Sequence, residues 1–151
     1  MLQLTPAQAA QLANSVYQVK DIEPALFNRI DLKLPDTFAV GSRVVGASGL
    51  GPGTLSGFGF VATGSKQHEK ETIVAIRGTD GAADALTDAL IGFGVPGPTG
   101  TTVHTGFNRT WNTLKGQIDR ALPASSLAGT TVHCVGHSLG GALATLAADH
   151  L

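Results

Sequence analysis

Hydrophobic and polar residues recur with two different periods along the chain, and these periods predict both helices and strands. The segment "LTPAQAAQLANSVYQV" has the helical period. Thr5 is a favourable N-cap, Pro6 suits the first helical position, and Gln8 completes a capping box. The helix is expected to bury one stripe, formed by Ala9, Leu12, Ala13, Val16 and Val19.

Three later segments have the character of strands: "SGFGFVATG", "ETIVAIRGT" and "TVHCVG". The runs "TIVAI" and "TVHCV" are apolar throughout, which is typical of central strands covered on both faces. Between and after them, helices are predicted at 80–93, within 103–122 and at 140–151, whereas "GVPGPTGTT" is expected to be a loop. Strands that alternate with helices favour an α/β fold, with a mainly parallel sheet and flanking helices.

Composition and charge narrow the class of protein. The 151 residues fit a single domain, 1–151, and 42% of them are hydrophobic. The formal net charge is -1 and no cluster of Lys and Arg occurs, so no nucleic-acid partner is expected. The single cysteine, Cys134, lies in an apolar run and is expected to be a small buried residue.

Targeting and metal-binding signals are absent from the sequence. The N-terminus lacks a basic leader with a long apolar core, and no run reaches the roughly 18 residues of a membrane span. We therefore expect a cytoplasmic protein, or one exported without a cleavable signal. The five histidines lack the spacing of a metal site, so neither a metal nor another cofactor is expected.

The segment "VGHSLGG" carries the clearest chemistry. It contains G-x-S-x-G, from Gly136 to Gly140, between a predicted strand and a predicted helix. In that context the pattern predicts a nucleophile elbow with Ser138 exposed on a sharp turn, and with the N–H of Leu139 aimed at an oxyanion. The glycines would let strand and helix pass closely. The alternative is a serine that only caps the following helix.

An oxyanion hole needs a second donor, and "AIRGTD" supplies a candidate at the end of another strand. Thr79 offers both its N–H and its hydroxyl there. An ordinary turn at the end of a strand is the alternative for this segment.

The segments "IVAIRGT", "VHTGFNRTW" and "VGHSLGGALATLAA", in this order, resemble the class 3 lipase family of α/β-hydrolases. The resemblance implies a serine esterase acting on triacylglycerols, phospholipids or related lipid esters, with transient contact at a lipid interface. It makes Ser138 the nucleophile and Thr79 and Leu139 the oxyanion-hole residues. It also implies a lid from Asp80 to about Pro98, and the candidate lid residues are Asp80, Asp84 and Asp88.

The base and acid of the triad have no evident place in the chain. In α/β-hydrolases they follow the serine, but only thirteen residues follow Ser138. His150 would stand roughly 18 Å along the helix axis from the serine. His137 adjoins the serine but should point away from it. Upstream, His104 is the foremost candidate for a rearranged triad.

We therefore expect the N-terminal portion of a class 3 lipase domain, with acid and base downstream of Leu151. An uncovered sheet edge should then favour self-association. The alternative function is a non-catalytic remnant of the hydrolase fold that binds a lipid or a protein.

Overall fold

The computed structural model describes residues 4–19, 25–26, 31–47, 55–78, 94–122 and 128–151. Its N-terminal part contains helix α1 (Pro6–Ser15), the 3-10 helix η1 (Val16–Val19), strands β1 (Phe38–Gly46) and β2 (Ser56–Gly64), the 3-10 helix η3 (Lys66–His68) and strand β3 (Glu71–Ile76). The C-terminal part contains strands β4 (Gly94–Pro96) and β5 (Thr102–His104), helix α3 (Thr105–Ala121), strand β6 (Thr131–Gly136) and helix α5 (Leu139–His150).

The main sheet has the strand order β1-β2-β3-β6 and is mixed. The expected parallel pairing joins β3 to β6, where Glu71 is opposite Thr131 and Ile76 is opposite Gly136. By contrast, β1 pairs antiparallel with β2, and β2 pairs antiparallel with β3. The short connections around β2 permit hairpins, whereas the long connection through α3 permits the parallel crossover. The described sheet is therefore less parallel than the sequence predicts.

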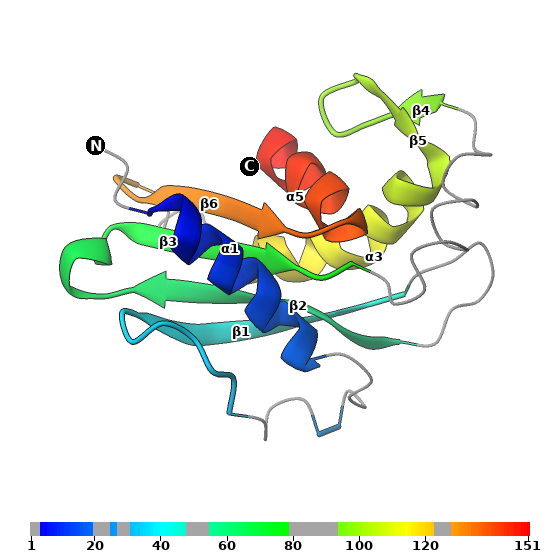
Figure 1. Ribbon diagram of the computed structural model, residues 1–151. Coiled ribbons are helices and arrows are strands. Elements are labelled where there is room, and N and C mark those ends of the chain that lie inside the picture. Colours follow the sequence, from blue (N-terminus) through cyan, green and yellow to red (C-terminus); the bar gives the residue numbers. More distant parts are fainter. Residues whose placement is uncertain (1–3, 20–24, 27–30, 48–54, 79–93, 123–127) are drawn as a thin grey trace.

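Helices cover both faces of this sheet, so the molecule has three layers (Figure 1). On one face, α1 and η1 bury Leu12, Val16 and Val19 against β2 and β3. On the other face, the core is formed by Trp111, Leu114 and Ile118 of α3 with Leu143 and Leu146 of α5, packed on Phe58, Val74 and Ile76. Every residue of β3 is buried, which confirms the prediction of a strand covered on both sides.

Helix α1 begins as predicted. The Thr5 hydroxyl accepts a hydrogen bond from the N–H of Gln8, while the Gln8 side chain accepts one from the N–H of Thr5. Pro6 occupies the first turn. This capping box satisfies backbone donors that the first turn would otherwise leave unpaired, so the start of the helix is determined locally.

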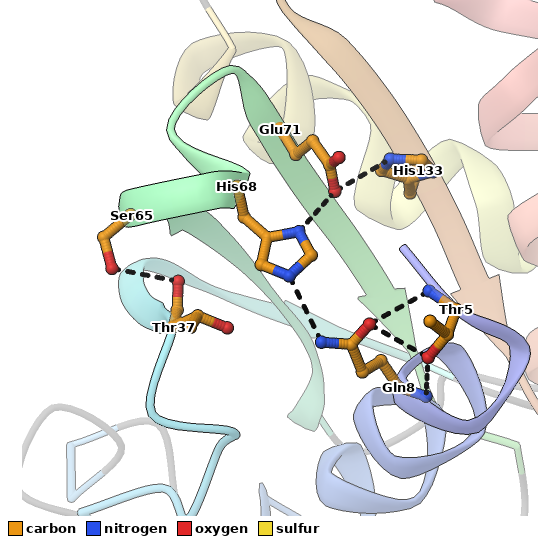
Figure 2. A network of polar contacts seen from close by, with 7 residues as sticks. All are labelled: Thr5, Gln8, Thr37, Ser65, His68, Glu71 and His133. Atoms are coloured by element: carbon orange, nitrogen blue, oxygen red, sulfur yellow. Dashed lines mark hydrogen bonds and ion pairs between the residues drawn. The ribbon is translucent and has the colours of Figure 1, made fainter. Parts of the chain in front are cut away.

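A buried polar network connects the start of α1 to the sheet (Figure 2). The Gln8 amide is 3.2 Å from Nε2 of His68, and Nδ1 of His68 is 3.0 Å from Oε2 of Glu71. The same carboxylate oxygen is 3.4 Å from Nε2 of His133 on β6. Glu71 is the first residue of β3, so the network stabilises the end of the sheet opposite to the turn that follows β6.

Three other sequence predictions differ from the structure. Strand β1 was not predicted, because bulges between Val40 and Ser42 and between Val44 and Val45 interrupt its alternation. The segment expected to be a loop forms the β4–β5 hairpin, in which Gly94 pairs with His104. Strand β6 was expected to be covered on both faces, yet it is the last strand of the described sheet and its residues are exposed or half-buried.

None of the helices in these ranges of the chain is long and apolar enough to cross a membrane.

Candidate active site

Ser138 lies on a sharp turn between strand and helix. Strand β6 ends at Gly136 and α5 begins at Leu139, which leaves only His137 and Ser138 to reverse the chain direction. Ser138 has φ 56° and ψ -128°, a conformation that residues with a Cβ rarely adopt. Such strain costs about 1–3 kcal/mol and clusters at functional sites. Both residues of the turn are exposed, so the hydroxyl of Ser138 is accessible.

The turn does not use the Ser138 side chain as a helix cap. Ser138 occupies the N-cap position of α5, but its side chain makes no capping hydrogen bond. The backbone closes the turn instead: the carbonyl of His137 accepts from the N–H of Gly140 at 3.0 Å, and that of Ser138 accepts from Gly141 at 2.9 Å. Among the described residues the hydroxyl therefore has no hydrogen-bond partner, and it lies beside the positive end of the α5 dipole.

Two glycines allow this turn to pack against the sheet. A Cβ at Gly136 would overlap the carbonyl group of Gly140, and a Cβ at Gly140 would overlap the carbonyl oxygen of Ile76 at the end of β3. Strand and helix are thus in main-chain contact at the turn. Leu139 is the first residue of α5, half-buried against the core beneath, and its N–H belongs to the unpaired first turn of the helix.

The end of β3 lies beside the nucleophile candidate. A Cβ built on Gly78 would be 3.2 Å from the Cβ of Ser138 and 2.8 Å from the carbonyl oxygen of His137. The guanidinium of Arg77 holds this strand end, since it donates to the carbonyl of Gly78 at 2.8 Å and to that of Gly57 at 2.6 Å. The chain segment that leads into Thr79 is therefore adjacent to Ser138.

Thr79 itself lies outside the described residues. So do the lid candidates Asp80, Asp84 and Asp88 and the helix predicted at 80–93.

The histidines at the start of α3 and the end of α5 have partners of their own. Nδ1 of His104 accepts from the N–H of Gly106 at 3.0 Å and so caps α3. Nε2 of His150 is 2.8 Å from a carboxylate oxygen of Asp119, and its ring packs edge-on against Trp111. The structure thus places neither histidine as a partner of Ser138.

The remaining histidines are engaged as well. His68 and His133 both face Glu71 at the far end of the sheet. The imidazole of His137 is directed to the hydroxyl of Tyr17, at 3.0 Å from Nδ1. Each of the five histidines therefore has a local role that differs from that of a base for Ser138.

Comparison with known proteins identifies the family to which this geometry belongs. A family model described as lipase (class 3) matches residues 73–151, which is more than half of the chain. The chain belongs to the class 3 lipase family. A relative from Fusarium solani, named secreted mono- and diacylglycerol lipase 1, is 35% identical over 125 residues, covering 80% of this chain and 34% of the relative.

Structural comparison supports the fold. The crystal structure of Lip2 lipase from Yarrowia lipolytica matches 95% of this chain with a TM-score of 0.63 and 23% sequence identity. The match extends over 51% of that lipase chain. The α/β-hydrolase-like fold predicted from the sequence is therefore confirmed, and this class 3 lipase chain spans about a third to a half of the lengths of these two proteins.

A groove runs along the outer edge of β6, between α1 and α5. It encloses about 430 Å³ and is lined mostly by small residues, among them Ala9, Ala13, Val135 and Ala144. Cys134 also lines it, and burial raises the pKa of its thiol to about 11. Within the described part of the chain, no further strand pairs with β6 at this edge.

Sequence reasoning missed the contact between Tyr17 and His137. The two residues are 120 positions apart, so no local spacing relates them. The only signal was that Tyr17 is the single tyrosine of the chain and stands at the end of a predicted amphipathic helix.

Proposed function

We propose that this class 3 lipase hydrolyses carboxylic esters of lipids, with Ser138 as the nucleophile. The observation that carries the proposal is the strained, exposed Ser138, held between β6 and α5 and without a capping bond. This conformation costs backbone strain, but it gives a nucleophile access to a carbonyl carbon and to the N-terminal N–H groups of a helix.

The reaction would proceed in two steps. The hydroxyl oxygen of Ser138 attacks the acyl carbon while a base takes its proton, and the N–H groups of Leu139 and Thr79 stabilise the oxyanion. The ester C–O bond then breaks and the proton passes to the departing alcohol. Water releases the acid from the acyl-enzyme by the same route, which regenerates Ser138.

We infer that the base and its orienting carboxylate come from residues downstream of Leu151. Two observations support this: all five histidines of the chain are held in other contacts, and the compared lipases are two to three times as long as the matched region. Because the Fusarium relative is named for mono- and diacylglycerols, partial glycerides are the first substrates to compare with triacylglycerol and phospholipid.

Within the described residues, the outer edge of β6 has no partner strand. A strand with unpaired N–H and C=O groups and apolar neighbours is a template for pairing, so we propose that the 151-residue chain alone self-associates through this edge. Sedimentation velocity over a range of concentrations should show dimers or larger species. A monomer at all concentrations would contradict the proposal.

A fluorophosphonate probe tests the nucleophile. We would label the 151-residue chain, the full-length product of the same gene, and Ser138→Ala in both, with Ser42→Ala on β1 as a matched serine control. The proposal expects labelling of the longer protein that Ser138→Ala abolishes and Ser42→Ala preserves. Labelling of the short chain would place a base within it, and unlabelled long protein would favour a non-catalytic binding module.

A further inference from the structure

Tyr17 connects the N-terminal helical segment to the turn that carries Ser138. It lies in η1, between Val16 and Val19, which are both fully buried in the core on that face of the sheet. Its hydroxyl is 3.0 Å from Nδ1 of His137, and the two rings meet edge to face with centroids 6.1 Å apart. The half-buried tyrosine therefore stands between two buried residues, while its hydroxyl reaches the turn.

The hydroxyl also lies close to the nucleophile candidate itself. A Cβ built on Gly78 would be 2.9 Å from the Tyr17 hydroxyl and 3.2 Å from the Cβ of Ser138. The hydroxyl oxygen of Tyr17 and the Cβ of Ser138 can therefore be no farther apart than the sum of these two distances. Tyr17, His137 and Ser138 thus converge on the end of β3.

His137, which makes this contact through its side chain, directly precedes a strained part of the backbone. The carbonyl of His137 accepts the hydrogen bond from Gly140 that begins α5, and the next residue, Ser138, has the unusual φ of 56°. Strained conformations persist only where the surrounding structure determines them on several sides. The glycine contacts join the turn to the sheet, and the Tyr17 hydroxyl contacts the side chain of His137 within the turn.

We propose that Tyr17 is a positioning residue: its hydrogen bond to His137 holds the backbone of Ser138 in the conformation that presents the nucleophile. The inference rests on the proposed function of Ser138, but it concerns a different residue and can be tested separately. A hydrogen bond of ordinary strength changes an equilibrium by about 2- to 10-fold, so this is the size of the effect expected on the reactivity of Ser138.

The first test is spectroscopic and needs no turnover. NMR of the folded chain should show that Tyr17→Phe shifts the ring ¹⁵N resonances of His137 and the ¹³Cα and ¹³Cβ resonances of Ser138. Gln18→Ala is the matched control, because it removes two hydrogen bonds between the same 3-10 helix and the backbone of Lys33. Unchanged Ser138 resonances in Tyr17→Phe, or equal shifts in Gln18→Ala, would overturn the proposal.

The second test is a double-mutant cycle on the rate constant of phosphonate labelling, in the longer gene product. Tyr17→Phe should slow labelling about 2- to 10-fold. In the His137→Ala background it should have no further effect, whereas His137→Asn, which places an amide near the position of Nδ1, should preserve most of the wild-type rate. A full Tyr17→Phe effect in the His137→Ala background would mean that Tyr17 contacts the reagent directly, and would refute positioning through His137.

The outcomes separate the two proposals. If Ser138 is never labelled, the proposed function fails, while the NMR comparison still decides whether Tyr17 holds the Ser138 backbone. If labelling depends on Ser138 but not on Tyr17, the function stands and the positioning role is refuted.

Discussion

Replacing Gly140 by alanine should destabilise the protein, although alanine is the better helix former. A Cβ at this position would overlap the carbonyl oxygen of Ile76 and lie 2.7 Å from the carbonyl carbon of Arg77. Both are main-chain atoms at the end of β3, so no side-chain rotation relieves the overlap. Relief requires α5 to move away from the sheet.

Two opposing effects set the magnitude. Alanine in place of glycine inside a helix favours the folded state by up to about 1 kcal/mol. An extra methyl group in a well-packed interior costs about 1–3 kcal/mol, and an overlap with main-chain atoms belongs at the upper end of that range. The expected net result for Gly140→Ala is a loss of about 1–2 kcal/mol from the free energy of unfolding.

Gly141 provides a matched control in the same turn of α5. A Cβ there would be 3.4 Å from the carbonyl oxygen of Gly136, which is ordinary van der Waals contact. Gly141→Ala should therefore keep the gain in helix propensity and raise stability by up to about 1 kcal/mol.

Urea denaturation followed by circular dichroism measures both variants. With an m-value of about 1–3 kcal/mol per molar urea, the midpoints of Gly140→Ala and Gly141→Ala should differ by roughly 1 M. Equal midpoints, or a midpoint of Gly140→Ala at or above that of the wild type, would refute the argument from close packing.

Three further predictions concern other parts of the chain. Glu71→Ala should lower the free energy of unfolding by about 1–3 kcal/mol, because the buried imidazole of His68 loses a hydrogen-bond partner and the half-buried His133 loses a nearby carboxylate. The exposed pair of Asp31 and Lys33 makes Asp31→Ala the control, which should shift thermal unfolding much less. Equal shifts for the two variants would contradict this. Burial raises the pKa of Cys134 from 9.0 to about 11, so at pH 8 iodoacetamide should alkylate the folded chain about 100-fold more slowly than the urea-unfolded chain. The alkylation rate of the folded chain should rise about tenfold per pH unit toward pH 11. Equal rates for the folded and unfolded chains at pH 8 would show an exposed thiolate. His150→Ala should leave phosphonate labelling of Ser138 unchanged, since His150 faces Asp119, and a large loss of labelling would make His150 the base after all.

The parts of the fold that were predictable are those determined by nearby residues. Helix α1 has its capping box within four residues, and α3 has its apolar stripe within three turns, so local sequence determines both. Strand β1 was not predicted because its bulges shift the alternation of its side chains. The β4–β5 hairpin was not predicted because Gly and Pro are frequent in its sequence. In each case the partner strand, rather than the segment itself, determines the structure.

The candidate site likewise combines features that the local sequence predicts with features that depend on distant segments. The pattern G-x-S-x-G predicts a turn with close main-chain contacts, and the Gly136–Gly140 contact is present in the structure. The apolar run of β6 indicates that the strand can be covered, but it does not indicate which elements cover it. In the described residues, no strand pairs with the outer edge of β6. The Tyr17–His137 contact joins segments 120 residues apart, and only the packing of η1 on the sheet brings them together.

The two proposals treat positioning and activation of Ser138 as separable in this chain. The contacts around its backbone lie within these 151 positions: Gly136 against Gly140, Gly140 against Ile76, and Tyr17 with His137. None of these contacts supplies a base, because His137, the histidine nearest in sequence, is directed to the hydroxyl of Tyr17. If these contacts alone hold the serine in position, it should have the same geometry in a protein that contains the base and in one that lacks it. For that reason the NMR resonances of Ser138 test its geometry, whereas labelling tests its activation.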